Sequence, residues 1–280
     1  MKNEIRKTTN PFDINPKHIY NEISKEIGLI CPEYSSIKSQ ISRYIKKQLP
    51  PDISKFNEIP DESEYYINER DENFMIFKNS NIIIFQSPFQ TELFIKYNEN
   101  MFADGTFYIA PIFGYQVFIT RIYAPEIKSF YTTLLSILNN KEQATYELSF
   151  EELKKNASKY NNIIVTPKIL HCDFEKGISN AAIKIFHNIT IKYCVWHYKR
   201  SLEVQKNKLC YNEVENNHKI YLLYKAITNF PFINPEYIFD IYNHIKIICQ
   251  IYNYFNFLNF LEYRLIYINM IFNIGIIITI

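Results

Sequence analysis

The order of the element-forming runs between residues 101 and 210 is the feature that most restricts the fold of this chain. Three strand-like runs come first, at residues 101–110, 115–123 and 130–138. The short gaps between them contain proline or glycine, which is typical of hairpin connections. A meander followed by alternating helices and strands predicts an α/β fold, with a mixed sheet in the order 3-2-1-4-5 and flanking helices. The predicted alternating elements are a helix at 141–160, a strand at 168–173, a helix at 175–187 and a strand at 190–196.

The residues before this core have a different sequence pattern. Helical spacing predicts two short helices at 17–27 and 35–47, and the acidic stretch 60–72 is typical of a linker or long loop. A β-hairpin is predicted at 73–87. We therefore expect an N-terminal helical arm and linker at 1–72, an α/β core at 73–210, and a helical region at 211–280.

Charge does not decide between classes of partner. The chain has 31 Lys and Arg against 29 Asp and Glu, a net charge of +2, which neither supports nor excludes a nucleic-acid partner. Arg43, Lys46 and Lys47 give the second predicted helix a basic face. That face is either part of a DNA-contacting helix pair or a solvated surface, and we favour the second because charge runs usually serve solubility.

The cysteines indicate the compartment. There are five, an odd number, and their spacing is irregular. The chain begins with a polar stretch and not with a signal peptide, so we expect free thiols in a reducing compartment, nuclear or cytoplasmic.

Residues 265–280 carry no charge. A helix that spans a bilayer needs roughly 20 apolar residues, so this shorter segment with two asparagines makes a membrane partner unlikely. We favour a buried core element, and a truncated or frame-shifted terminus is the second interpretation.

Asp104 and Asp173 are the candidate metal ligands. Aspartate supplies oxygen ligands for Mg²⁺ or Mn²⁺, and strands 1 and 4 are neighbours in the predicted order, so both side chains can project into one cleft. Asp104 has apolar neighbours, so we expect a buried carboxylate that needs a partner. The structural alternatives are a turn at Asp104-Gly105 and a helix N-cap at Asp173.

Cys194 and His197 form a C-x-x-H pair where the fifth predicted strand meets a helix. A thiolate and an imidazole can bind zinc, but a structural site needs four ligands. Cys210 and His218 are available only at a spacing of eight. Zinc is therefore unlikely, and a packed thiol and imidazole are the simpler interpretation. The glycine content, five residues, excludes a Gly-rich nucleotide-binding loop in practice.

The motifs of residues 73–230 together resemble the transposase domain of Mutator-like elements (MULE). They occur in the order and spacing of that family. They are D-G-T-F at 104–107, N-K-x-x-x-T-Y at 140–146, D-F-E at 173–175, and C-x-x-H at Cys194 and His197.

This resemblance implies a ribonuclease-H-like fold and a DDE-type DNA transposase, a polynucleotidyl transferase in which three acids hold two divalent ions. Asp104 and Asp173 match the first two acids and would be catalytic and metal-binding. Cys194 and His197 match the family's C/H pair, with a structural or DNA-contacting role. The implied partners are transposon ends, target DNA and a second copy of the chain, with no small-molecule substrate.

The chain departs from the family pattern at the third acid, a glutamate in an N-N-x-x-E stretch after a helical insertion. None of its Asn-Asn pairs is followed by a glutamate at that spacing, and Glu262 and Glu236 are the candidate substitutes. We expect a truncated transposase with impaired catalysis. The alternative is a catalytically dead DNA- or protein-binding remnant of a transposable element.

Overall fold

The computed structural model describes residues 15–28, 31–46, 53–63, 66–161 and 164–263. The chain has two compact units, residues 1–54 and 55–280. In the first unit, α2 (Pro16–Ile27) and α3 (Tyr34–Lys46) are in contact. Asn15 begins α2, because its side-chain oxygen accepts a hydrogen bond from the Lys17 N–H at 2.9 Å.

Two of the basic residues of the second predicted helix lie at its end. Arg43 and Lys46 are in the last turn of α3, where positive charge complements the helix dipole. The Arg43 Nε also donates a hydrogen bond to the Ser39 carbonyl at 3.1 Å. These contacts give Arg43 a role within its own helix, and Lys47 lies outside the described residues.

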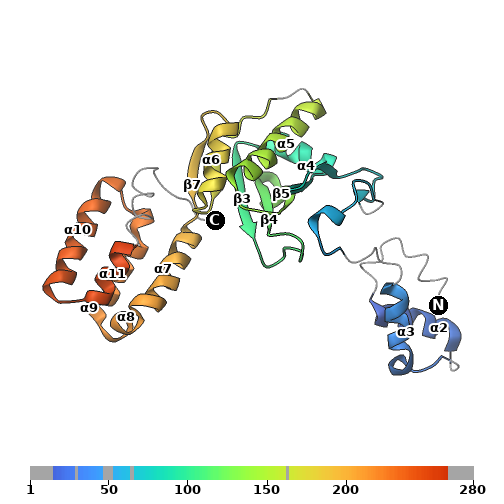
Figure 1. The fold of residues 1–280 in the computed structure, drawn as a ribbon, viewed down its shortest axis with the longest axis horizontal. Helices are drawn as coiled ribbons and strands as arrows, with labels where there is room; N and C mark the ends of the chain where they lie inside the picture. The colour runs from blue at the N-terminus through green and yellow to red at the C-terminus, as the bar shows by residue number, and fades with distance from the viewer. Residues whose placement is uncertain (1–14, 29–30, 47–52, 64–65, 162–163, 264–280) are drawn as a thin grey trace. The chain divides into compact units, whose positions relative to one another are not determined.

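The second unit is built on a seven-stranded mixed sheet with the order β1-β2-β5-β4-β3-β6-β7 (Figure 1). The neighbouring strands β1, β2, β5, β4 and β3 pair antiparallel in this order, whereas β3, β6 and β7 pair in parallel. The predicted order 3-2-1-4-5 is confirmed, and the predicted hairpin extends the sheet beside β5. The strands are β1 (Met75–Lys78), β2 (Ile82–Phe85), β3 (Asn100–Thr106), β4 (Gln116–Ala124), β5 (Ser129–Leu138), β6 (Ile169–Cys172) and β7 (Thr190–Tyr193).

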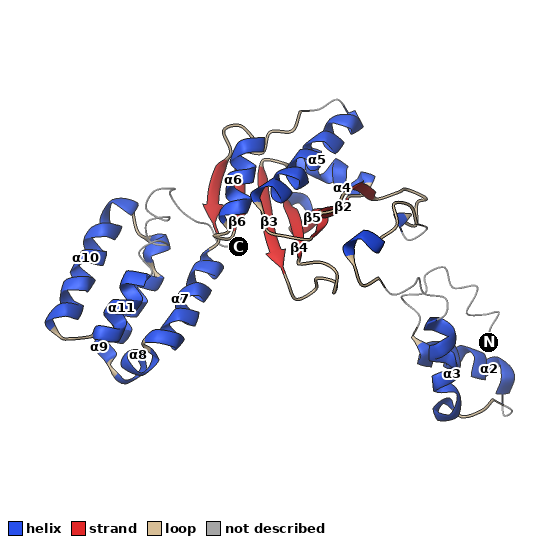
Figure 2. Ribbon diagram, in the orientation of Figure 1, coloured by secondary structure: helices blue, strands red, loops and turns tan. Residues whose placement is uncertain are grey.

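Three helices pack on one face of this sheet (Figure 2): α4 (Pro88–Tyr97), α5 (Gln143–Asn161) and α6 (Lys176–Ile185). Alternate residues of the strands point toward them, as Met101 and Ala103 of β3 do. The fully buried Phe118 of β4 packs edge-on against Tyr146 and Phe150 of α5, with ring centroids 5.1 and 5.7 Å apart. The main core therefore lies between the sheet and these helices. The fold is consistent with a ribonuclease-H-like architecture.

The helical region after β7 has its own buried contacts. Lys206 is buried and pairs with Glu203 and Glu215 at 3.0 and 3.2 Å. The Glu213 carboxylate accepts a hydrogen bond from the Phe257 N–H at 2.8 Å and so ties α8 to the start of α11. The helices are α7 (Val195–Leu209), α8 (Tyr211–Asn216), α9 (His218–Thr228), α10 (Pro235–Ile251) and α11 (Phe255–Tyr263). Short 3-10 helices lie at Phe56–Glu58, Pro125–Ile127 and Phe230–Phe232 in the described part of the chain.

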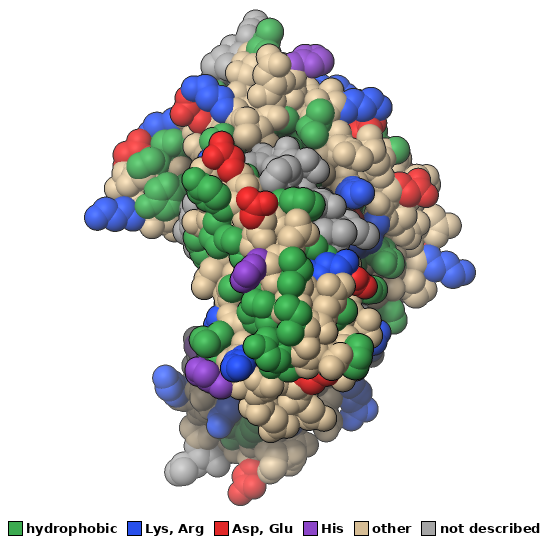
Figure 3. All heavy atoms as spheres, turned by 90° about the vertical axis from the view of Figure 1, so that its left-hand side faces the viewer, with side chains coloured by type: hydrophobic (Ala, Val, Ile, Leu, Met, Phe, Trp, Pro, Cys, Tyr) green, Lys and Arg blue, Asp and Glu red, His purple; other side chains and the backbone are tan. Residues whose placement is uncertain are grey.

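Hydrophobic side chains also gather on the outside of this helical region (Figure 3). Phe239, Ile247, Ile251 and Phe255 are each more than half exposed. Among the described residues, no helix is both long and apolar enough to cross a bilayer. The uncharged residues 265–280 lie outside the described residues.

We predict that Phe118→Ala lowers the free energy of unfolding by about 3–5 kcal/mol, because it leaves a cavity where two α5 rings pack. Urea unfolding measures the loss. The matched control is Tyr108→Ala, since Tyr108 is 97% exposed and its removal changes stability by less than about 0.5 kcal/mol. Equal losses in the two variants would show that this layer is not the core.

Candidate metal centre

Asp104 lies within β3, where it pairs with Ile119 of β4. The alternative of a turn at Asp104-Gly105 is therefore wrong. Because Met101 and Ala103 point into the core, Asp104 projects from the opposite face, and its side chain is 64% exposed. The expected burial of this carboxylate is also wrong, since strand alternation carries it to solvent.

Gly105 leaves room for a neighbouring side chain. A Cβ atom at this position would lie 1.6 Å from the Gln116 Nε2, and Gln116 is fully buried. A side chain at position 105 would displace the side chain of Gln116, which lies on the strand next to Asp104. The glycine of D-G-T-F is thus explained by packing beside the candidate ligand.

Asp173 follows the last residue of β6 and is fixed by a local hydrogen bond. Its Oδ1 accepts a hydrogen bond from the Glu175 N–H at 2.9 Å, the geometry of an Asx turn that leads into α6. The side chain is partly buried, and burial raises the pKa of its carboxyl above the usual value. The N-cap of α6 is Glu175, so the alternative of a helix N-cap at Asp173 is wrong, and the second oxygen of Asp173 remains for other ligands.

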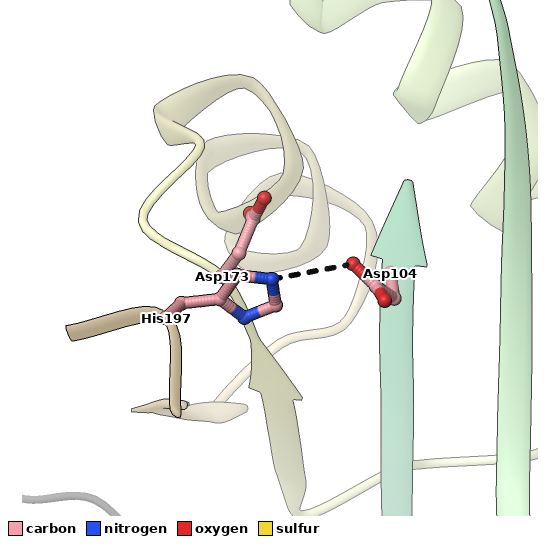
Figure 4. Close-up of side chains that lie close together, drawn as sticks. All are labelled: Asp104, Asp173 and His197. Carbon is pink, nitrogen blue, oxygen red and sulfur yellow. Dashed lines mark ion pairs between the residues drawn. The ribbon is translucent and has the colours of Figure 1, made fainter. Parts of the chain in front are cut away.

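The structure brings Asp104 and Asp173 together and adds His197 (Figure 4). One ligand atom from each residue lies within 4.8 Å of the other two. The His197 Nε2 is 3.9 Å from the Asp104 Oδ1. The Cys194 side chain, and then the two carboxylates, raise the pKa of His197. His197 comes from the first turn of α7, which begins where the parallel strands end.

A cavity of about 320 Å³ opens at this group, on the sheet face opposite α4, α5 and α6. Arg121 lines it together with Phe102, Phe130 and His171. The His171 ring stacks on Phe102 with centroids 4.4 Å apart. Burial lowers the pKa of His171 to about 4, so this ring is neutral at physiological pH.

Glu175, the last residue of D-F-E, is held by α5. Its Oε2 accepts a hydrogen bond from the Lys141 Nζ at 2.7 Å, and its Oε1 lies 2.5 Å from the Tyr146 hydroxyl. The same hydroxyl lies 2.7 Å from the Gln116 Oε1. Burial of the Tyr146 hydroxyl, and then the neighbouring Glu175, raise the pKa of Tyr146. The N-K-x-x-x-T-Y run thus supports the segment that carries Asp173 and does not itself reach the cavity.

The other candidates lie apart from this group. Among the described residues, neither Glu236 nor Glu262 joins the three ligands. Glu262 pairs with Lys246 at 2.9 Å, and the Glu236 N–H donates to the Asn234 side chain at the start of α10. Cys194 lines the cavity as the N-cap of α7 but is not one of the three ligands. Cys210 and His218 do not complete a four-ligand zinc site within the described part of the chain.

Two carboxylates and an imidazole fit a divalent cation. Carboxylate oxygens suit Mg²⁺ and Mn²⁺, and an imidazole nitrogen is well tolerated by Mn²⁺. The exposed Asp104 and the partly buried Asp173 can both turn an oxygen toward one position. Sequence reasoning treated His197 as a separate motif, although its place four residues after β7 signals the same edge of the sheet.

Residues 101–201 match the family model described as the MULE transposase domain. The search among curated proteins gave no match. The resemblance inferred from the motifs is confirmed for this segment, which holds Asp104, Asp173, Cys194 and His197.

Burial of Asp173 predicts a pH-dependent effect on stability. Because the folded pKa is raised, the protonated carboxyl stabilises the fold at low pH, and this stabilisation is lost as the pH rises through the raised pKa. We predict that Asp173→Asn is more stable than the wild type at about pH 7, and that the difference shrinks toward about pH 4. Urea unfolding at both pH values tests this. Asp240→Asn, at an exposed position, is the control, and an Asp173→Asn variant less stable at neutral pH contradicts it.

The contacts of Tyr146 predict a second effect. Tyr146→Phe removes the hydroxyl from two buried or partly buried polar neighbours, Gln116 and Glu175, and we expect it to lower the free energy of unfolding by about 1–3 kcal/mol. Tyr108→Phe at the exposed position is the matched control and should change nothing measurable. Thermal unfolding of both variants tests this prediction, and equal midpoints for Tyr146→Phe and the wild type would contradict it.

Proposed function

We propose that this chain is the core of a DDE-type DNA transposase, which cleaves phosphodiesters and transfers strands at terminal inverted repeats. One observation carries the proposal. Within a segment that matches the MULE transposase domain, an aspartate in β3 and an aspartate directly after β6 converge with a histidine at one cavity. The family generally uses divalent metals, and this group of side chains has suitable ligand atoms.

Asp104 and Asp173 would hold the Mg²⁺ or Mn²⁺ ions. Such ions, when bound, polarise the phosphodiester and increase the acidity of the attacking hydroxyl. The chain's own contribution is positional. The β3 strand presents Asp104 to solvent, while the Glu175 N–H fixes one oxygen of Asp173. His197 lies where it can contact either an ion or a phosphate.

We further propose that catalysis by this chain is weak. Only two carboxylates converge among the described residues, and the nearby Glu175 is occupied by Lys141 and Tyr146. A missing metal carboxylate removes charge stabilisation and position from an ion, which reduces the rate strongly. The proposed partners remain transposon ends and target DNA in the nucleus or cytoplasm, with two copies of the chain to hold two ends.

Mn²⁺ binding by the purified full chain tests the proposal. We expect Asp104→Asn and Asp173→Asn each to weaken Mn²⁺ binding by about tenfold or more, because each removes a charged ligand. Asp240→Asn is the matched control and should bind Mn²⁺ like the wild type. Unchanged affinity in both site variants would rule out this metal centre.

Nicking of a terminal-repeat duplex in Mn²⁺ is the second measurement. We expect slow cleavage by the wild type and none by Asp104→Asn. Full activity that Glu262→Gln abolishes would contradict the proposal of impaired catalysis and would make Glu262 the third acid. DNA binding without any cleavage, equal in the wild type and Asp104→Asn, would instead support the non-catalytic remnant.

A further inference from the structure

A row of four side chains crosses the sheet face that the helices α4, α5 and α6 leave free. The pairing of neighbouring strands puts Lys192 of β7 beside His171 of β6, His171 beside Phe102 of β3, and Phe102 beside Arg121 of β4. Paired residues of neighbouring strands point to the same face. The row therefore carries a cation at each end and two stacked rings between them.

This row lies next to the candidate metal ligands. Asp104 and Asp173 come two residues after Phe102 and His171, so they form the next row on the same face of the sheet. Arg121, Phe102 and His171 line the same cavity as the two aspartates. A second hollow continues from Phe102 and His171 toward Tyr97 and Tyr123. The cavity thus runs on from the metal ligands over aromatic side chains.

The two cations have no carboxylate partners in the described part of the chain. Among those residues, no Asp or Glu oxygen lies within ion-pair distance of Arg121 or Lys192, although many surface lysines of this unit are paired. Arg121 is exposed and lines the cavity. An unpaired guanidinium beside metal-binding carboxylates suits a phosphate, to which it can donate two parallel hydrogen bonds.

We propose that Arg121 and Lys192 bind backbone phosphates of a DNA strand that enters the metal centre across Phe102 and His171. This inference rests on the proposed function and names the residues that would hold its substrate. Neighbouring strands are roughly 4.8 Å apart, so the Cα atoms of Arg121 and Lys192 lie about 14 Å apart across the sheet, wide enough for more than one nucleotide. The stacked rings offer an apolar surface for sugars or bases between the two phosphate contacts.

Binding of a labelled single-stranded oligonucleotide in EDTA tests this inference without the metal. We expect Arg121→Gln and Lys192→Gln each to weaken binding about threefold to tenfold at low salt. Each should also reduce the slope of log affinity against log salt by about 0.7, the value for one lost phosphate contact on a single strand. Arg121→Lys keeps the charge and should retain more affinity than Arg121→Gln.

Arg70→Gln and Lys225→Gln, which lie outside the row Lys192, His171, Phe102 and Arg121, are the matched controls and should leave affinity and salt slope unchanged. Thermal unfolding shows whether each variant is folded. If the wild type binds DNA and both Arg121→Gln and Lys192→Gln bind it equally well with the same salt slope, the inference is wrong while the proposed function stands. If the wild type binds neither single-stranded nor duplex DNA, both fail.

Discussion

The candidate site depends on the parallel pairing of β3 with β6. Phe102 pairs with His171, and each of the two candidate aspartates follows its paired residue by two positions. Because the strands run in the same direction, Asp104 and Asp173 lie at the same height on the same face. The parallel pairing of β6 with β7 then ends at Tyr193, so α7 begins at this edge and brings His197 with it. Two pairings therefore place all three ligands.

A second set of contacts joins the residues next to the two aspartates. The Tyr146 hydroxyl reaches Gln116, which packs against Gly105, and also Glu175, which follows Asp173. One hydroxyl on α5 thus contacts the neighbours of both ligands without entering the cavity. Lys141 at the start of the same helical region neutralises the Glu175 carboxylate at 2.7 Å. These contacts bring D-G-T-F, N-K-x-x-x-T-Y and D-F-E, which lie far apart in the sequence, together in the fold.

Much of this fold could be predicted because the strand pattern and its turns are local features. The strand order of the core and the hairpin at 73–87 both follow from spacing and turn residues. Helix α4 was not predicted, although Ser87 and Gln90 form a capping box at its start. Its apolar residues do not keep to a clear stripe, and the helix contacts both α5 and the sheet.

The details of the site were harder to predict because they depend on which face of a strand a residue occupies. Apolar neighbours made Asp104 look buried, but alternation places it in solvent. His197 and Arg121 reach the cavity only through tertiary pairing, which a single sequence does not show. The location of residues 265–280, and the three-part division of the chain, stay predictions. Along the sequence, the boundary between the two compact units falls between residues 54 and 55, inside the predicted N-terminal arm and linker.

The most direct test of the account is a crystal structure of the full chain soaked in Mn²⁺, with the ion located by anomalous scattering. We expect a peak in contact with carboxylate oxygens of both Asp104 and Asp173 and within reach of the His197 Nε2. A peak only at other acidic side chains would contradict the claim that these strands build a shared metal centre. The absence of a peak, with the two carboxylates turned away from each other, would contradict it as well.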